Sequence, residues 1–457
     1  MIKRMLVANR GEIAVRIIRA AREMGIHTIQ VYSDADKESL AVRMADEAIC
    51  IGPTKAAKSY LNIESILAAA RDTRADAVHP GYGFLAENAE FADAVIEAGM
   101  VFIGPEGDIM RRMGDKATAR ETAANAGVPT VPGSEGRVAT LDVAREIAAN
   151  IGYPVMIKAS AGGGGRGIRV ANDETELAEQ FFPAQSEAEA AFGDGGLYLE
   201  KLVLGARHIE IQVLGDGQKA VHLFERECSL QRRRQKVWEE APSCALSSPI
   251  RERMGAAAVL LAEAVNYCGA GTVEFLFDEK TEEFYFIEMN TRIQVEHPVT
   301  EWITGVDLIR EMISVAQGLP LPFAQTDIPC RGHAIEVRIN AEDPSMDFMP
   351  NPGTISSLTL PEGPGIRFDG LLYDGYAIPP FYDSLLGKLI VWDTDREKAI
   401  ARLKRALEEF SIEGVKTTKP LHQALAEDKD VLAGRVHTKW LEQWLVSDSA
   451  KLRGEQG

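Results

Sequence analysis

The sequence predicts an α/β protein of about three domains, with a parallel sheet covered by helices in its first third. Apolar strand patterns alternate with helical patterns along the first third of the chain, and turn residues follow each strand. The length of 457 residues fits about three domains of roughly 150 residues each. The hydrophobic fraction of 46% is that of an ordinary globular protein, which excludes a wholly disordered chain.

The first expected elements are a strand at residues 3–8 and a helix at residues 12–24. The helix is predicted because its apolar residues share one face and a glycine follows them, at Ile13, Ile17, Ala20, Met24 and then Gly25. Three more short strands are expected at residues 27–32, 77–79 and 101–103. This order predicts a Rossmann-like sheet, but the turn after the first strand lacks the three glycines of an NAD-binding fingerprint.

Two changes of pattern divide the rest of the chain. A middle section begins near Gly114 and contains loops rich in glycine and proline. Around Arg331 the pattern changes to two strands and a charged helix, at residues 333–340, 388–392 and 396–410. The last residues, 447–457, are polar, and we expect them to fray.

The formal net charge is -18, from 50 lysines and arginines and 68 aspartates and glutamates. An acidic surface repels phosphate backbones and anionic membranes, so we expect neither a nucleic-acid nor a membrane partner. The first residues lack the apolar core of a signal peptide, and no apolar stretch approaches the roughly 20 residues of a membrane helix. We therefore expect a cytoplasmic protein whose anionic substrate meets a local basic patch.

The segment 226–236 is the candidate for that patch, because it carries five basic residues and one acid. The alternative interpretation is a solvated surface face. Five scattered cysteines form no C-x-x-C pair, which is typical of a reducing compartment and argues against structural zinc. We expect all of them to be small buried hydrophobic residues: Cys50, Cys228, Cys244, Cys268 and Cys330.

A glycine-rich loop at residues 161–167 lies between two strand patterns. Its glycines satisfy G-x-G-x-x-G, which alone is weak evidence. The following residues 168–170 resume a strand, and the next helix begins only after Asp173, in a capping box with Glu176. A strand–loop–strand arrangement excludes the Rossmann and Walker loops, which open directly into a helix. The pattern favours a flap whose backbone amides close over phosphates; a mobile surface hairpin is the alternative.

An acidic pair follows from a predicted hairpin, in which residues 271–277 and 284–290 alternate with period two. If the hairpin is symmetric about Thr281, Glu274 faces Glu288 with Cβ atoms roughly 5 Å apart. Two facing carboxylates repel unless a cation lies between them, and Asn290 adds an oxygen ligand on the same face. Oxygen ligands without His or Cys indicate Mg²⁺ or Mn²⁺ that carries nucleotide phosphates. The alternative interpretation is a solvated edge hairpin without a metal.

The segment Asn-Thr-Arg-Ile-Gln-Val-Glu-His-Pro-Val-Thr-Glu at residues 290–301 resembles the signature of biotin carboxylases. Further matches lie at residues 79–85, 113–116, 161–167, 231–236 and 338–344, and the resemblance extends to about residue 446. It implies an ATP-grasp fold with a Rossmann-like N-terminal domain at 1–113, an ATP-grasp domain at 114–330 and an α+β C-terminal domain at 331–446. The glycine-rich lid would span about 131–204.

The resemblance also implies roles for single residues. ATP would be bound by Lys116, Lys158, Gly164, Gly165, Glu200, Lys201, Val203 and His208. The metal, Mg²⁺ or Mn²⁺, would be held by Glu274, Glu288 and Asn290, in agreement with the hairpin argument. Bicarbonate would be bound by Lys236, Arg292 and Val295, with Glu296 as the general base and Arg338 facing the biotin ureido oxygen. For Arg338 the alternative is a strand arginine paired with Glu336.

Two departures from the family pattern are visible. Arg234 stands where the family usually has a histidine that contacts the nucleotide, and an arginine can only donate, for example to phosphate or ribose oxygens. The turn at residues 278–283 is slightly longer than usual, which affects only the turn.

The leading interpretation is ATP-dependent carboxylation of biotin, as in acetyl-CoA carboxylase. Because the chain has no biotinylation sequence of the Ala-Met-Lys-Met type, biotin would be attached to a separate carrier protein. The resemblance implies a homodimer that works with carrier and carboxyltransferase subunits. The alternatives are another ATP-grasp carboxylate or carbamoyl ligase, or a catalytically silent nucleotide-binding regulatory protein.

Overall fold

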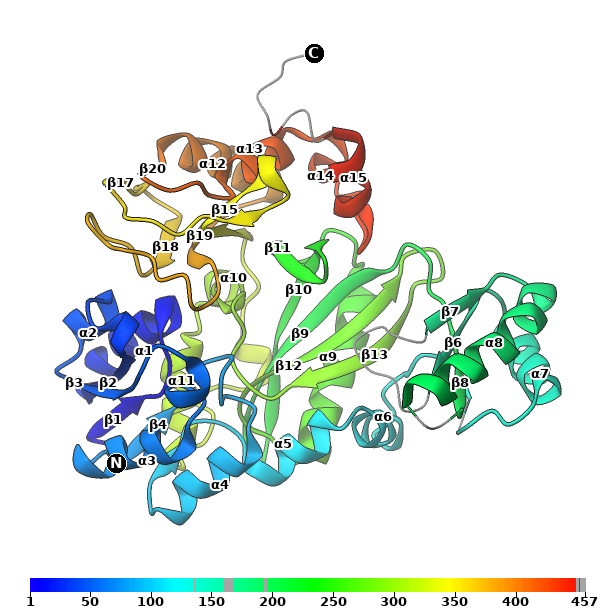
Figure 1. Ribbon diagram of the computed structural model, residues 1–457, viewed down its shortest axis with the longest axis horizontal. Coiled ribbons are helices and arrows are strands. Elements are labelled where there is room, and N and C mark those ends of the chain that lie inside the picture. The colour runs from blue at the N-terminus through cyan, green and yellow to red at the C-terminus, as the bar shows by residue number, and fades with distance from the viewer. Residues whose placement is uncertain (135, 160–167, 193–194, 449–451, 453–457) are drawn as a thin grey trace. The chain divides into compact units, whose positions relative to one another are not determined.

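The computed structural model describes residues 1–134, 136–159, 168–192, 195–448 and 452, and it confirms the α/β class (Figure 1). The chain forms two compact units. The larger unit comprises residues 1–128, 207–275 and 288–457, and the smaller comprises 129–206 and 276–287. Among the described residues, no helix is long and apolar enough to cross a membrane.

The larger unit begins with a five-stranded sheet whose paired strands all run parallel. Its order is β3 (Glu47–Gly52), β2 (His27–Ser33), β1 (Arg4–Val7), β4 (Ala77–His79) and β5 (Val101–Phe102). The four predicted strands are therefore confirmed to within one residue at each end, and β3 is an addition. The accompanying helices are α1 (Gly11–Glu23), α2 (Leu40–Met44), α3 (Ile63–Asp72), α4 (Ala89–Glu97), α5 (Gly107–Gly114) and α6 (Lys116–Asn125).

Helix α1 begins one residue earlier than predicted and turns its apolar face into the core. Ile13 and Ile17 are almost completely buried there. The helix ends where expected, because the Met24 amide donates to the Ala20 carbonyl at 3.1 Å and Gly25 has a φ of +71°, a left-handed conformation that glycine adopts without strain. The first turn of this helix holds Glu12 inside the protein, at 2% exposure.

A second sheet of eight strands contains residues from both the middle and the C-terminal sections of the sequence. Its order is β13 (Glu283–Asn290), β12 (Cys268–Asp278), β9 (Arg207–Asp216), β10 (Ala220–Arg232), β11 (Gln235–Ala241), β14 (His333–Asn340), β19 (Leu385–Asp393) and β18 (Ile366–Gly370). Strands β11 and β14 pair antiparallel, so the sheet continues across residue 330. The domain boundary expected there stays a prediction.

Helices pack on this sheet where the sequence predicts a charged helix. Helix α12 (Arg396–Glu409) packs against β14 and β19 with its apolar face, because Leu403 and Leu407 are fully buried (Figure 1). The other helices are α9 (Ser248–Ala264), α10 (His297–Thr304), α11 (Leu308–Ala316), α13 (Lys419–Glu427), α14 (Lys429–Leu432) and α15 (Trp440–Asp448). Two small ladders pair β15 (Glu342–Asp343) with β16 (Met349–Pro350) and β17 (Ser357–Thr359) with β20 (Ser411–Glu413). Helix α15 includes residues 447 and 448, which we expected to fray, and most later residues lie outside the described ones.

The smaller unit contains the strand–loop–strand arrangement that the sequence predicts. Its sheet has the order β7 (Ile168–Ala171), β6 (Val155–Ala159) and β8 (Leu197–Lys201), with helices α7 (Leu141–Ile151) and α8 (Glu174–Phe192). Strands β6 and β7 pair antiparallel, so a hairpin joins them, while residues 160–167 lie outside the described ones. The expected capping box is altered, since the Glu176 carboxylate accepts from the amide of Asn172 rather than of Asp173.

The cysteines differ from expectation. All five are free, but only Cys228 is buried, whereas Cys50, Cys244 and Cys330 are exposed. The expectation of five buried hydrophobic residues is wrong for the exposed three. Cys50 lies on β3, the edge strand of the first sheet, and Cys244 and Cys330 lie in loops that the core does not cover.

Candidate active site

A buried carboxylate in the larger unit joins two cationic side chains from neighbouring strands. Glu296 stands at the N-terminus of α10 and is 2% exposed. It accepts a hydrogen bond from Lys236 Nζ at 2.6 Å and another from Arg338 Nη2 at 3.0 Å. Burial alone would raise the pKa of Glu296, but the nearby cations Lys236 and Arg338 hold it well below its usual value. Glu296 is therefore ionised at neutral pH and can accept a proton.

Lys236, from β11, is the centre of a ring of carboxylates. Its ammonium group lies 2.5 Å from Glu210, 3.2 Å from Glu274 and 2.6 Å from Glu296. Burial would lower the pKa of this lysine, but the three carboxylates raise it well above its usual value. Lys236 therefore stays protonated, and in this structure its charge is balanced by the surrounding carboxylates.

Arg338, from β14, is bound to a second buried acid. Its Nε donates to Glu239 Oε1 at 2.6 Å, so the expected alternative of a pair with Glu336 is wrong. The strand register explains this contact, because Glu239 on β11 stands opposite Glu336 and is thus a diagonal neighbour of Arg338. Burial raises the pKa of Glu239 to about 7, although the charge of Arg338 opposes the shift. The guanidinium is thus fixed by two carboxylates from different elements.

Two further buried groups lie beside this arginine. Neither carboxylate oxygen of Glu336 has a hydrogen-bond partner among the described residues, and burial raises its pKa well above the usual value. Lys388 stands opposite Arg338 in the β14–β19 ladder and is fully buried. Its ammonium group donates to the Val295 carbonyl at 2.6 Å and lies 3.2 Å from Glu12. Lys388 therefore fixes the backbone at Val295, one of the residues expected at the bicarbonate site.

Arg292 lies between an acid and an amide. Its Nε donates to Glu87 Oε2 at 2.8 Å, and its Nη2 donates to Asn290 Oδ1 at the same distance. The amide of Thr291 also donates to Glu87, at 3.0 Å. Glu87 thus fixes both the side chain of Arg292 and the backbone before it, a role that no sequence pattern indicated.

Glu274 lies at the meeting point of several polar side chains. It accepts hydrogen bonds from Asn290 Nδ2 and Gln294 Nε2, both at 3.0 Å, and His208 Nε2 lies 3.1 Å away. Burial would raise the pKa of Glu274, but Lys236 and His208 lower it strongly. Two of the three residues expected to hold the metal, Glu274 and Asn290, are thus in direct contact.

Glu288, the third expected metal ligand, is more accessible. Burial and the charge of Glu274 raise its pKa, and the ammonium group of Lys116 lies 3.8 Å from its carboxylate. The Lys116 side chain is 87% exposed at the first residue of α6. Two carboxylates that repel one another suit a hard cation such as Mg²⁺ or Mn²⁺. Asn290 directs its amide NH₂ to Glu274 in this structure, and its Oδ1 accepts from Arg292, so the amide would have to turn to act as an oxygen ligand.

Two other groups of side chains lie close enough for a shared ion among the residues that the structure describes: His208, Glu210 and Glu274, and Glu210, Cys228 and Glu296. In both groups the carboxylates already contact the ammonium group of Lys236. Lys236 therefore supplies the positive charge that these clusters need.

The basic run at 226–236 is mostly engaged in contacts within the protein. Arg226 is completely buried and donates to Glu210 at 2.6 Å. Arg232 and Arg233 pair with Asp347 at 2.6 Å and 3.0 Å. Arg234 is exposed in the turn between β10 and β11, with a left-handed φ of +67°. The run is therefore not a continuous free patch, and the expected contact of Arg234 with a nucleotide stays a prediction.

Most of the other residues predicted to bind the nucleotide lie in the smaller unit, whereas His208 and Lys116 belong to the larger unit. Lys158 on β6 is bound to Glu200 on β8, and these two strands pair antiparallel. Lys201 ends β8, and Val203 follows it. Gly164 and Gly165 lie outside the described residues. The cation expected at the phosphates is thus paired with the acid expected near adenine.

A cavity of about 240 Å³ opens onto the central residues of this site. Its lining includes Lys236, Val295 and Arg338, together with Tyr82 and Asp383. A small planar molecule can therefore reach the guanidinium of Arg338 and the ammonium group of Lys236 from the same space.

The sequence reasoning missed several acids that organise the site, namely Glu87, Glu210 and Glu239. One signal was available for Glu210. The strand segment His208-Ile209-Glu210-Ile211-Gln212 alternates polar with apolar residues, and both faces are buried except for part of His208. Polar side chains on a buried strand face indicate a polar network or a site.

Comparisons with known proteins agree over almost the whole chain. Family models match the biotin carboxylase N-terminal domain at residues 1–110, the ATP-binding domain of the carbamoyl-phosphate synthase L chain at 115–324 and the biotin carboxylase C-terminal domain at 336–443. The chain is 56% identical over 450 residues to biotin carboxylase 1 of Bacillus subtilis (strain 168), covering 98% of this chain and 100% of the relative.

Two further relatives extend the comparison. A pyruvate carboxylase subunit of Methanothermobacter thermautotrophicus is 52% identical over 454 residues, covering 99% of this chain and 92% of the relative. A solved structure of the biotin carboxylase domain dimer of Hydrogenobacter thermophilus 2-oxoglutarate carboxylase, in complex with magnesium ADP, ADP and bicarbonate, is 50% identical. It aligns with a TM-score of 0.86 and covers 99% of each chain.

Proposed function

This chain belongs to the biotin carboxylase family, and from that premise we propose how its side chains divide the reaction. The enzyme is an ATP-grasp ligase that uses ATP and bicarbonate to carboxylate biotin. The observation that carries the assignment of roles is the position of Glu296, which accepts from both Lys236 and Arg338. One base thus lies between the cation assigned to bicarbonate and the cation assigned to biotin.

In the first step, bicarbonate is held by Lys236, Arg292 and the backbone of Val295. Bicarbonate is a weak nucleophile, so Glu296 removes its proton as its oxygen attacks the γ-phosphate of ATP. The products are ADP and carboxyphosphate. Lys236 and Arg338 hold the pKa of Glu296 low, so this carboxylate is ionised, as a general base must be before it takes a proton.

In the second step, carboxyphosphate releases CO₂ and phosphate, and the phosphate takes the proton from biotin N1. The resulting enolate carries negative charge on the ureido oxygen, and the nitrogen attacks CO₂. Arg338 stabilises that charge, because its guanidinium is already fixed by Glu239 and Glu296 and need not reorganise.

For ATP, we assign the phosphates to Lys116 and Lys158, with Gly164 and Gly165 of the lid. The adenine and ribose lie along Glu200, Lys201 and Val203, with His208 and Arg234 beside the nucleotide. A divalent cation, Mg²⁺ or Mn²⁺, would be held by Glu274, Glu288 and Asn290. Such an ion supplies charge neutralisation on the ATP phosphates when bound. Support for magnesium comes from the relative solved with magnesium ADP.

The partners follow from the chemistry of a biotin-dependent carboxylase. We assign biotin to a separate carrier protein and its use to a carboxyltransferase. Support comes from biotin carboxylase 1 of Bacillus subtilis, because this chain matches that relative over its whole length. We propose a homodimer, as in the relative solved as a dimer, and a cytoplasmic location. Acetyl-CoA carboxylase and fatty acid synthesis form one context, and the pyruvate carboxylase relative offers another.

Another ATP-grasp ligase is less well supported. The carbamoyl-phosphate synthase model matches only the central domain, whereas both flanking domains match biotin carboxylase models. A silent regulatory protein has no need of Glu296 and Arg338, yet both are present and in contact.

The test is ATP hydrolysis with and without bicarbonate and free biotin, while labelled bicarbonate is followed into biotin. We expect bicarbonate-dependent hydrolysis and label in biotin. ATP turnover with no label in biotin would indicate another ligase, and ATP binding without turnover would indicate a silent regulatory protein.

A further inference from the structure

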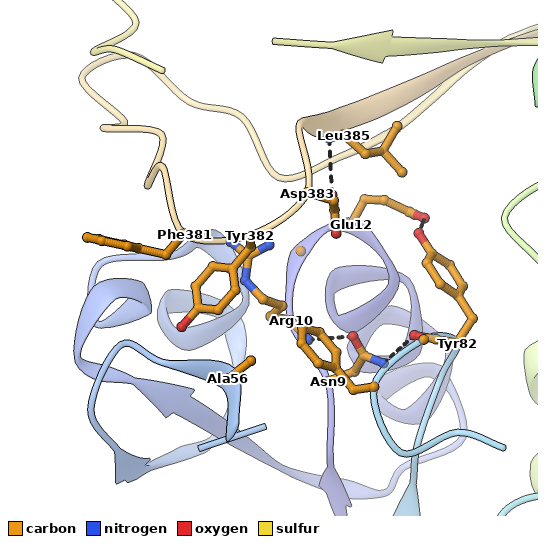
Figure 2. Close-up of a pocket in the computed structure, with 12 residues that line it drawn as sticks. Asn9, Arg10, Glu12, Ala56, Tyr82, Phe381, Tyr382, Asp383 and Leu385 are labelled. Carbon is orange, nitrogen blue, oxygen red and sulfur yellow. Dashed lines mark hydrogen bonds between the residues drawn. The ribbon is translucent and has the colours of Figure 1, made fainter. Parts of the chain in front are cut away.

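A second cavity, of about 440 Å³, lies in the larger unit beside the residues proposed to bind biotin. Its lining comes from four places: the β1–α1 turn with the start of α1, Ala56, the segment around Tyr82, and the loop that leads into β19 (Figure 2). In Figure 2 the rings of Phe381 and Tyr382 border one side, Asn9 and Arg10 lie at the base, and Glu12 and Tyr82 close the opposite side. The proposed reaction of ATP with bicarbonate gives no role to Phe381, Tyr382, Asn9 or Arg10.

This cavity adjoins the one that contains Arg338. Tyr82, Asp383 and Leu385 line both cavities. The hydroxyl of Tyr82 is bound to Glu12, which fixes the ring at the boundary between them. A molecule whose head contacts Arg338 can therefore extend past Tyr82 into the second cavity.

The lining excludes a second nucleotide or another polyanion. Among the described residues that line the cavity, Arg10 is the only basic one, and its guanidinium is bound to Asp36 by two hydrogen bonds of 2.7 Å and 2.8 Å. The carboxylates of Glu12 and Asp383 add negative charge. Phosphate groups would be repelled there.

The same lining suits an uncharged chain with an apolar body and one polar link. The rings of Phe84, Phe381 and Tyr382 offer apolar surface, and Arg10 lies 4.2 Å from the centre of the Tyr382 ring and holds it in place. Glu12 is 2% exposed, and its Oε2 has no hydrogen-bond partner among the residues that the structure describes. That oxygen is buried, so the accessible acceptor for an amide N–H is the carboxylate of Asp383, an exposed residue that lines both cavities.

We propose that this second cavity receives the arm of biotinyl-lysine, the aliphatic and amide chain that joins biotin to its carrier protein. The inference rests on the proposed function, because it takes the ureido ring to lie at Arg338. The arm has alkyl segments that can pack on the aromatic lining and one amide that can donate to Asp383. Phe381 is 62% exposed at the rim, so it contacts the carrier protein where the arm leaves the enzyme.

The test compares three substrates of increasing length: free biotin, biotinyl-lysine and the biotinylated carrier. Ala56→Phe fills the cavity from its base, since Ala56 is half-buried at the start of a short 3₁₀ turn (Ala56–Lys58). Phe381→Ala removes the rim aromatic. Phe182→Ala in α8 is the matched control, because Phe182 is 57% exposed and belongs to the smaller unit.

We expect Ala56→Phe to raise KM for biotinyl-lysine and for the carrier by about tenfold, the usual effect of losing a well-packed contact region, with kcat/KM for free biotin changed by less than about twofold. Phe381→Ala should raise KM mainly for the carrier. Bicarbonate-dependent ATP hydrolysis without biotin and the Phe182→Ala control should match the wild type.

Three results would overturn the proposal: unchanged KM for biotinyl-lysine in Ala56→Phe, equal losses with free biotin and biotinyl-lysine, or an effect confined to the carrier. A wild-type enzyme that labels none of the three substrates would instead overturn the proposed function itself, and this inference with it.

Discussion

Two lysines assigned to anionic substrates lie in opposite surroundings. The side chain of Lys236 is 12% exposed and has three carboxylates within 3.2 Å, whereas that of Lys116 is 87% exposed and has an ion pair of 3.8 Å with Glu288. The first is part of the folded structure, and its removal leaves three buried carboxylates without the cation that they share. The second is available to a ligand, so its removal should affect binding with little effect on folding. Lys236 thus contributes to the folded structure of the site, whereas Lys116 is accessible to a ligand.

The largest expected effect comes from the substitution Lys236→Met. It leaves Glu210, Glu274 and Glu296 buried without their shared cation, so we expect a loss of about 3–5 kcal/mol in the free energy of unfolding. Urea denaturation measures it, and Lys116→Met, expected to change stability by less than about 1 kcal/mol, is the matched control. If both variants were equally stable, the buried ring of carboxylates would not depend on Lys236.

The substitution Arg338→Lys tests the second largely buried cation of the site, after Lys236. Lysine keeps the charge but cannot hold Glu239, Glu296 and a ureido oxygen in one planar fork. We expect biotin carboxylation to fall by about 10²–10³-fold, with bicarbonate-dependent ATP hydrolysis in the absence of biotin retained. Equal losses of both activities would show that Arg338 acts on the first step through Glu296.

Neighbouring acids on β11 should respond to pH in opposite directions. The pKa of Glu239 is raised to about 7 by burial, so its stabilising contribution is complete below pH 4.5 and is lost as the pH rises through 7. The pKa of Glu240 is lowered to about 2: burial opposes this shift, but Arg396 and His333 outweigh it. Its contribution is therefore present above pH 4.5 and lost as the pH falls towards 2.

Glu239→Gln tests this assignment, since it removes the titrating group while keeping a polar side chain. As the pH rises from 5 to 8, the free energy of unfolding of the wild type should fall by on the order of 1–3 kcal/mol more than that of the variant, since one pKa unit corresponds to about 1.4 kcal/mol. Unfolding curves at several pH values provide the measurement. Parallel curves for the two proteins would contradict a raised pKa at Glu239.

The smallest expected effect comes from the substitution Lys116→Met, because this lysine is exposed. We expect ATP to bind about tenfold more weakly, the value of one charge-assisted contact to phosphate. Titration of ATP into both proteins measures the change. Unaltered ATP affinity would remove Lys116 from the nucleotide site.

Local patterns predicted much of the fold and part of the site. Helix α1 and four of the five strands of the first sheet follow from periodicity and turn residues within a few positions, whereas β3 was not predicted. The β6–β7 hairpin follows from the strands that flank the glycines. The contact between Glu274 and Asn290 follows from a hairpin whose strands are adjacent in sequence.

The carboxylates around Lys236 and Arg338 could not be predicted in this way. Glu210, Glu274 and Glu296 lie 26, 38 and 60 residues from Lys236, and Arg338 lies 99 residues from Glu239. Such pairs depend on the order and register of strands β9, β11 and β14, which local periodicity does not determine. For the same reason the pairing of Arg338 with Glu336, its neighbour by alternation, was a wrong alternative.

The most direct test of the central claim is the transfer of labelled bicarbonate to biotin by Glu296→Gln. The wild type should label biotin, and the variant should bind ATP with unchanged affinity while its bicarbonate-dependent ATP hydrolysis and biotin labelling fall by about 10²–10⁴-fold, the usual range for loss of a general base. Labelling of biotin at the wild-type rate by Glu296→Gln would contradict the assignment of Glu296 as the base between the two cations.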